Sequence, residues 1–359
     1  MRQHSDESSN DAFSASCAII NGKYDEKHPL VSRVYANVNL LRGPSHYQFK
    51  KWNPTFGQIE RYKLIKLIGS GRYSEVFLAL QDDSKNCAVK VLKPVNNDRV
   101  RRELKILKEV QGQKNILNLL DIVIDRRYGI PSMVTEYVKN TTWRDLFTSF
   151  DMDDIRFYVY RLLQALSHTH KNGVMHRDVK PLNILCKNPR ENLVLADWGL
   201  AEFYHPLQKY STHVCTKYYK SPELLVGFQT YDYSIDMWSV GVLLLEALTL
   251  KIHIFDADDN EYMIDSIAEL MGSYDIFAWA TKYRIRISKA KRERIKHFQK
   301  VSFESLFPKS RAKFKDPIAI DLVKNLLVID HKKRLTADEA LEHPFFEPVK
   351  LVDEQTGEK

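Results

Sequence analysis

A short polar stretch, HRDVKPLN at residues 176–183, lies between two apolar runs of the sequence. Polar groups beside a hydrophobic core must find partners or take part in chemistry, because burying them unpaired is costly. Asp178 can accept the proton of an attacking hydroxyl group, and Lys180 can neutralise charge on a transferred phosphoryl group. This stretch is therefore the first candidate for a reaction site.

A second group of oxygen donors belongs to the same part of the chain. Asn183 ends the polar stretch, and Asp197 lies in ADWG at residues 196–199. Amide and carboxylate oxygens are the ligands that Mg²⁺ prefers in proteins. The segment between them, LCKNPRENLVLAD, is typical of a hairpin that would bring the two side chains together. The combined set predicts phosphoryl transfer assisted by magnesium.

The stretch IGSGRYSEV, residues 68–76, could hold phosphates. Gly69 and Gly71 allow a turn to approach an anion closely, with backbone N–H groups directed at it. A plain hairpin explains these glycines equally well. A dinucleotide-binding fold would require a helix directly after them, whereas EVFLAL at 75–80 alternates like a strand, so we reject that fold.

Lys90, in the apolar strand pattern CAVKVL, needs a partner if it lies inside the protein. Glu103, on a helical pattern further along the chain, is a suitable one. A lysine whose charged end reaches solvent is the alternative.

The elements that must position these residues follow from hydrophobic periodicity. Strands are predicted at 62–69, 75–80, 87–92, 116–125 and 131–138, with one helix at 100–110 among them. Helical patterns prevail from Trp143 onward, most clearly at 155–173. The sequence therefore predicts an α+β fold with a small β-rich lobe at 62–138, a hinge near 136–140, and a large, mostly helical lobe at 139–346.

Composition and the flanking segments set further limits. The chain has 359 residues, 44% of them hydrophobic, and a net charge of +8, which suits anionic partners without choosing among them. Its four cysteines show no metal-binding spacing, which indicates a reduced, intracellular protein. No secretory signal or membrane span is predicted, because the longest apolar run, 237–250, is too short and contains Glu246. We expect disorder at 1–29, an extended segment at 30–60 that docks on the rest, and a tail at 347–359.

Taken in order, these motifs resemble those of eukaryotic protein kinases: glycine loop, Lys90, Glu103, HRD loop, DWG and the SPE of 221–223. The sequence DMWSVG and Arg334 follow at the expected places. The resemblance implies a two-lobed α+β kinase fold and an ion pair between Glu223 and Arg334. Lys180 and Thr216 are similar to their counterparts in the serine/threonine branch.

A closer resemblance covers residues 31–346. DWGLAEFYHP, YDYSIDMWS, PELLVGF, GSGRYSEVF and VSRVYANVN together resemble the catalytic alpha subunits of casein kinase II, a family of the CMGC group. It implies a constitutively active enzyme whose residues 31–60 pack on the activation segment. It also implies acidic protein substrates, a regulatory beta subunit in an alpha2beta2 tetramer, and location in the nucleus and cytoplasm.

The same resemblance implies which residues hold ATP and magnesium. The adenine would lie against the backbone from Glu136 to Val138, and Lys90 would hold the α- and β-phosphates. Thr135 replaces a larger residue of that family, so we expect a preference for ATP over GTP. The expected nucleotide contacts are Ile68, Gly69, Gly71, Val76, Ala88, Lys90, Glu136, Val138, Leu185 and Asp197, with Mg²⁺ on Asn183 and Asp197.

Two basic groups are implied to bind acidic substrates. They are Arg99, Arg101 and Arg102 in the first group, and His213, Lys217 and Lys220 in the second. The family has lysines where this chain has Asn96, Asn97 and Asp98, which should weaken the acidic preference modestly, since an exposed ion pair contributes only ~0–1 kcal/mol. A solvated helix face is the alternative explanation of the arginines.

Three other functions compete with this interpretation. An inactive kinase-fold scaffold would have lost Lys90, Asp178 or Asp197, and all three are present. Another CMGC-group kinase would be proline-directed and phosphorylated on its activation segment. A nucleic-acid-binding module explains the net charge but none of the ordered acidic residues, so no direct binding of nucleic acid is expected.

Overall fold

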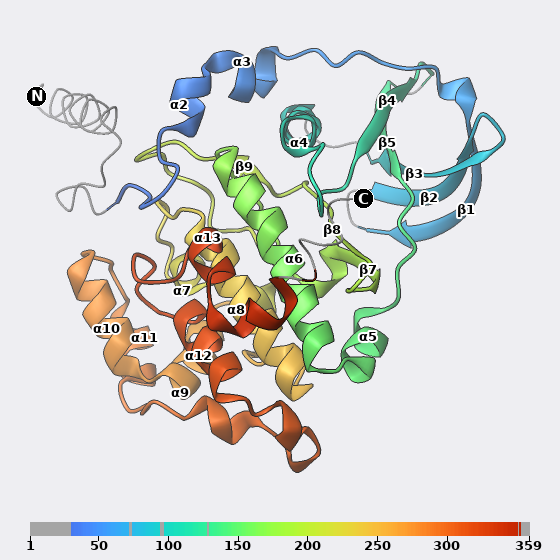
Figure 1. Ribbon diagram of the computed structural model, residues 1–359. Helices are drawn as coiled ribbons and strands as arrows, with labels where there is room; N and C mark the ends of the chain where they lie inside the picture. Colours follow the sequence, from blue (N-terminus) through green and yellow to red (C-terminus); the bar gives the residue numbers. More distant parts are fainter. Residues whose placement is uncertain (1–29, 72–73, 94–96, 128, 351, 353–359) are drawn as a thin grey trace, which may run out of the picture.

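The computed structural model describes residues 30–350 and 352, apart from 72–73, 94–96 and 128. The disorder predicted for 1–29 therefore lies outside the described residues, as does Asn96. The described chain has an antiparallel β lobe and a larger helical lobe (Figure 1), and thus the predicted α+β architecture.

The small lobe is a five-stranded sheet in the order β1-β2-β3-β5-β4, all neighbours antiparallel. Its elements are β1 (Tyr62–Ser70), β2 (Ser74–Gln81), β3 (Lys85–Leu92), α4 (Asn97–Val110), β4 (Leu119–Asp125) and β5 (Ile130–Glu136). β4 starts later than the 116–125 predicted, because Ile116 forms an isolated bridge with Leu195 of the large lobe instead. β5 ends at Glu136, where the chain leaves the sheet.

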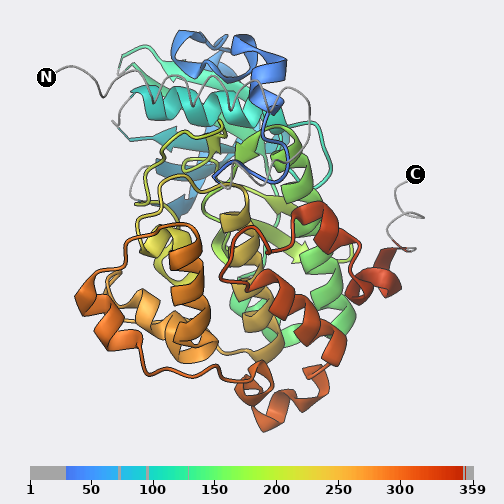
Figure 2. The same ribbon diagram turned by 90° about the vertical axis from the view of Figure 1, so that its left-hand side faces the viewer.

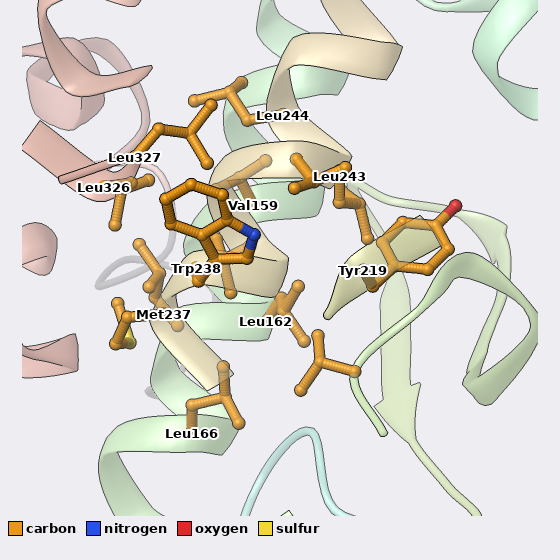
Figure 3. Close-up of a cluster of buried hydrophobic side chains, with 14 of the residues drawn as sticks. Val159, Leu162, Leu166, Tyr219, Met237, Trp238, Leu243, Leu244, Leu326 and Leu327 are labelled. Carbon is orange, nitrogen blue, oxygen red and sulfur yellow. The ribbon is translucent and has the colours of Figure 1, made fainter. Parts of the chain in front are cut away.

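The large lobe is built around two long helices. α6 (Met152–Lys171) begins with a capping box formed by Asp151 and Asp154, and α8 (Ser234–Thr249) is buried along nearly its whole length. Figure 3 shows Trp238 of α8 among leucines of α6 and of the segment around α12 (Pro317–Leu326). The apolar run at 237–250 is therefore a core helix. No described helix combines the length and apolar character needed to cross a bilayer.

Shorter elements complete this lobe. They are α5 (Trp143–Ser149), β6 (Val174–Met175), η3 (Pro181–Asn183), β7 (Ile184–Asn188), β8 (Asn192–Leu195), β9 (Glu202–Phe203), η4 (Lys217–Tyr219), α7 (Pro222–Leu225), α9 (Met263–Met271), α10 (Ser273–Lys282), α11 (Lys289–Ile295), η5 (Phe303–Leu306), η6 (Lys309–Phe314), α13 (Ala337–Leu341) and η7 (Pro344–Phe346). β7 and β8 form the predicted hairpin.

Residues 30–61 contain short helices, so the extended conformation expected for this segment is wrong. They are α2 (Val38–Arg42), α3 (Pro44–Tyr47), η1 (Phe49–Lys51) and η2 (Ile59–Arg61). Gly43, with a φ of 79°, ends α2, and Pro44 starts α3 directly after it. The segment lies along α4 and the large lobe (Figure 2).

Candidate active site

Asp178 is held rigidly on the loop between β6 and β7. Its Oδ1 accepts hydrogen bonds from the backbone N–H and the hydroxyl of Thr216, each at 2.9 Å. Its Oδ2 accepts from Lys180 Nζ at 2.8 Å and from Asn183 Nδ2 at 3.1 Å. Lys180 also donates to the hydroxyl of Thr216 at 2.8 Å. The loop thus fixes a carboxylate, a cation and an amide in one network.

Asp236, at the start of α8, anchors this loop from below. It is buried, and its carboxylate accepts from the backbone N–H groups of His176 and Arg177 at 2.9 and 2.8 Å. His170 of α6 contacts the same carboxylate at 3.0 Å. Sequence reasoning assigned Asp236 no role; the signal was an acidic residue at the start of an otherwise apolar helix.

His176 connects the loop to the DWG segment. Burial lowers its pKa, so the ring is neutral at physiological pH. Its Nε2 contacts the carbonyl oxygen of Ala196 at 3.1 Å, and its Nδ1 accepts from the N–H of Asp178 at 3.3 Å. Trp198 packs edge-on against the ring, with centroids 4.9 Å apart. This ring therefore sets the spacing between Asp178 and the residues that follow Ala196.

Lys90 bridges the two lobes. Its Nζ lies 2.6 Å from Glu103 Oε1 on α4 and 2.8 Å from Asp197 Oδ1 in the large lobe. Burial lowers the pKa of Lys90, but the two carboxylates outweigh that effect and the net shift is upward, so the amine stays charged. The ion pair with Glu103 expected from the sequence is present.

Asn183 and Asp197 fit a magnesium site by the chemistry of their oxygens. The N–H of Ala196 donates to the carbonyl of Asn183 at 2.8 Å, which brings Asn183 and Asp197 together at the open end of the β7–β8 hairpin, just outside its two strands. Burial alone would raise the pKa of Asp197, yet the charge of Lys90 holds it at about 2. The amide nitrogen of Asn183 is engaged by Asp178, which leaves the amide oxygen for a cation. These two residues would hold the metal.

A cavity of about 330 Å³ lies between the lobes and brings most of these groups together. The small lobe contributes residues of the glycine loop and of α4 to the cavity wall, and the large lobe contributes Asp178 and residues of the DWG segment. Its lining is Gly71, Ser74, Lys90, Leu92, Arg99, Val100, Glu103, Asp178, Lys180, Asp197, Gly199, Leu200, Cys215 and Thr216.

The residues predicted around adenine lie on the strands that frame the cleft. Ile68, Val76 and Ala88 belong to β1, β2 and β3, and Leu185 belongs to β7. None of these four, nor Gly69, lines the cavity described above.

The hinge residues line a different space. Glu136 and Val138 border a separate cavity of about 540 Å³. The carboxylate of Glu136 accepts from Asn118 N–H at 2.9 Å, and the backbone N–H of Glu136 donates to the carbonyl of Asn118 at 3.2 Å.

The basic residues predicted to bind substrate are dispersed. Arg99 lines the cavity. Arg101 instead donates to the carbonyl of Lys50 at 2.9 Å, and Arg102 pairs with Glu202 at 2.7 Å, so neither guanidinium enters the cavity.

The second basic group flanks Thr216 in the sequence, and Lys217 also makes a contact of its own. Lys217 donates to the carbonyl of Ala257 at 2.6 Å. Lys220 is half-buried, and burial lowers its pKa. His213 is exposed.

The activation segment, which runs from the DWG motif to the SPE motif, is held by contacts that the sequence did not predict. Glu202 accepts from Arg102 of α4 at 2.7 Å and lies 3.5 Å from Arg177 of the catalytic loop. Arg177 also donates to Leu200 O at 2.7 Å and to the hydroxyl of Tyr231 at 3.0 Å. Because Arg102 and Glu202 are far apart in sequence, no local pattern could have paired them.

The N-terminal segment contacts the same region. Asn39 donates to the carbonyls of Gly173 and Tyr204, at 2.8 and 2.7 Å. The N–H of Ser32 donates to the hydroxyl of Tyr204 at 2.7 Å, and Tyr47 packs against His205. These contacts tie residues 32–47 to the start of the activation segment.

The comparison with known families agrees with this geometry. Residues 62–346 match the model of the protein kinase domain. The match spans both lobes and every group described around the cavity. The ion pair between Glu223 and Arg334, buried with 2.8 Å between its atoms, is also present as the resemblance implied. The chain therefore belongs to the protein kinase family, whose members are phosphotransferases that use ATP and a divalent metal.

Proposed function

We propose that this protein is a constitutively active serine/threonine kinase of the casein kinase II alpha type, which phosphorylates hydroxyl groups near acidic residues. The observation that carries the proposal is the network in which Asp178, Lys180 and Thr216 meet at the edge of the cavity. The bound metal would neutralise phosphate charge. Asp178 accepts and orients the substrate hydroxyl, while Lys180 supplies a positive charge beside it.

Constitutive activity is supported by the carboxylate of Glu202. It gives Arg102 and Arg177 an anionic partner without any phosphate group. The N-terminal segment adds the contacts of Asn39 and Ser32. Both sets hold the activation segment in the unmodified chain, which is what an enzyme independent of phosphorylation requires.

Acidic preference is supported by Arg99, which lines the cavity, and by Lys217 and Lys220, which follow the cavity residue Thr216 in the sequence. We also propose a regulatory beta subunit over the small lobe. β1 carries four large apolar side chains that are each more than 40% exposed, which is unusual for one strand: Leu64, Ile65, Leu67 and Ile68.

A peptide-library screen with the unphosphorylated protein tests the substrate class. We expect Ser and Thr flanked by Asp or Glu to be phosphorylated, because Arg99, Lys217 and Lys220 are cationic. A requirement for proline after the acceptor, or activity only after phosphorylation of the activation segment, would contradict the proposal.

Replacing Asp178 by Asn tests the catalytic assignment. The amide keeps the shape of the side chain but is a much weaker proton acceptor, so kcat should fall by roughly 10²–10⁴-fold. Thermal unfolding should remain cooperative. A matched Asp256→Asn variant, which removes an exposed carboxylate 3.5 Å from Lys217, should keep a kcat close to that of the parent. Unchanged turnover in Asp178→Asn would remove the assignment.

A further inference from the structure

The segment from Lys282 to Lys300 is the most basic part of the large lobe, and the mechanism above does not use it. It contains nine lysines and arginines and one carboxylate, Glu293. Its net charge of +8 equals that of the entire chain. A surface with so concentrated a charge attracts anionic partners over roughly one Debye length, about 8–10 Å.

Part of this charge is compensated within the molecule. Lys282 pairs with Asp330 at 2.9 Å, Arg294 with Asp265 at 2.7 Å, and Lys296 with Glu293 at 2.5 Å. Four exposed side chains have no carboxylate partner among the described residues, and we call them the basic ridge: Arg284, Arg286, Lys289 and Arg292.

The local fold turns the ridge outward. Between Arg284 and α11 the chain is irregular and alternates, with Ile287 buried and Arg286 exposed. α11 then buries Ile295 and exposes Lys289 and Arg292, which are three residues apart on one helix face. The guanidinium of Arg292 lies over the ring of Phe277, 4.7 Å from its centroid, which restricts its movement. The charges are therefore presented on a supported surface.

The ridge adjoins the side of the molecule that receives substrate. Lys291 of α11 reaches the carbonyl of Leu225 at 3.5 Å, and Leu225 ends α7, the helix directly after the activation segment. α11 packs on α9, and α9 packs on α7. Figure 2 shows the orange helices α9–α11 beside the activation segment. In the sequence, Lys217 and Lys220 lie between Thr216, which lines the cavity, and helices α9–α11.

From this arrangement we infer that the basic ridge is a docking site for acidic tracts of protein substrates, separate from the cleft. The inference rests on the proposed function. A tract bound at the ridge raises the effective concentration of a tethered acceptor serine at Asp178. A flexible acidic polypeptide fits better than duplex nucleic acid or a membrane. It can direct its carboxylates to the four cations and away from exposed Glu261, Glu269 and Glu293, whereas the phosphates of a duplex or a membrane form a fixed array.

Binding of a hydroxyl-free probe tests the ridge without catalysis. We would titrate a fluorescent peptide of about twenty glutamates with the full-length protein and with the triple variant R284Q/R286Q/R292Q. Because exposed ion pairs are individually weak, the loss of three of them should make the triple variant bind about tenfold more weakly at low salt. The matched control K309Q/K313Q/K315Q removes the same charge from exposed residues of another surface, and should bind almost as the parent does.

Kinetics then separate docking from the reaction. The triple variant should show a raised KM for a substrate with a distal acidic tract, and the parent kcat and KM for a short acidic peptide. Equal losses of peptide binding in the control variant, or no loss of peptide binding in the ridge variant, would overturn the inference.

Binding of duplex DNA or of phosphatidylserine vesicles that depends on the ridge, while peptide binding does not, would also overturn it. If the parent fails to phosphorylate the short peptide, the proposed function fails, while the titration still decides the ridge.

Discussion

At the scale of single residues, the site depends on the contacts of Lys90 with Glu103 and Asp197. The backbone of Gly199, in the DWG segment, lies beside these two carboxylates. A methyl group on its Cα would stand 3.2 Å from Glu103 Oε2 and 3.4 Å from Asp197 Oδ1. The first distance is tighter than ordinary packing allows. The glycine therefore permits Lys90 to contact both carboxylates at once.

Gly199→Ala should lower kcat/KM about ten- to hundredfold, because even a small displacement of Glu103 or Asp197 moves Lys90 from its phosphate-binding position. The melting temperature should change little. Steady-state kinetics of Gly199→Ala, Glu103→Gln and the double variant form the test. If the alanine acts through Glu103, the two losses will be less than additive. Full additivity would exclude that route.

The sequence could predict which side chains meet in the site only where those residues lie close together along the chain. Asp178, Lys180 and Asn183 lie within one short loop, and Asp197 follows across a hairpin, so their spacing was enough to assemble them. The ion pair of Arg102 could not be predicted, because its partner, Glu202, belongs to the other lobe. No periodicity or local motif carries information about such a pair.

At the scale of elements, α8 supports the catalytic loop, and its position depends on how closely it packs with α12. Gly241 marks this close approach. A Cβ there would lie 2.8 Å from Leu327 Cδ2 and 2.9 Å from Leu326 Cβ. Figure 3 shows Leu326 and Leu327 beside Trp238 in the same cluster. The periodicity of 237–250 predicted a buried helix correctly, but it could not show which residue allows α12 to approach.

Gly241→Ala should destabilise the fold by about 1–3 kcal/mol, because the added methyl group overpacks a dense core and outweighs the helix propensity of alanine. Urea unfolding followed by circular dichroism measures the change. Leu327→Ala in the same chain provides the control, since the space it leaves can accept the new methyl group. The double variant should then lose less stability than the two single losses added together. A neutral or stabilising Gly241→Ala would disprove the close packing.

At the scale of the whole molecule, residues just before α13 join distant parts of the chain. Lys332 donates to the carbonyl of Val31 and pairs with Asp232, both at 2.7 Å. Arg334 pairs with Glu223 at 2.8 Å. Residues 331–334 thereby link the N-terminal segment, the activation segment and α8, a junction that only the assembled fold reveals.

His331 makes this junction sensitive to acid. Its ring is buried against Trp279, whose indole N–H donates to His331 Nδ1 at 3.1 Å. Burial lowers the pKa of His331 from 6.5 to about 4. Between pH 6.5 and about 4 the unfolded chain therefore takes up a proton that the folded chain refuses, so this residue lowers folding stability as the pH falls through that window.

His331→Gln should flatten the loss of stability between pH 6.5 and 4, because glutamine does not titrate and its Oε1 can accept the indole N–H of Trp279. Other buried histidines with lowered pKa, such as His176, keep part of the slope in both proteins. Urea unfolding at constant ionic strength, repeated across this range, gives the free energy of unfolding at each pH. The free energy of unfolding of the variant should rise relative to that of the parent as the pH falls, whatever the difference between them near neutrality. Parallel curves would show that His331 titrates alike in the folded and unfolded chains, and that burial does not control its charge.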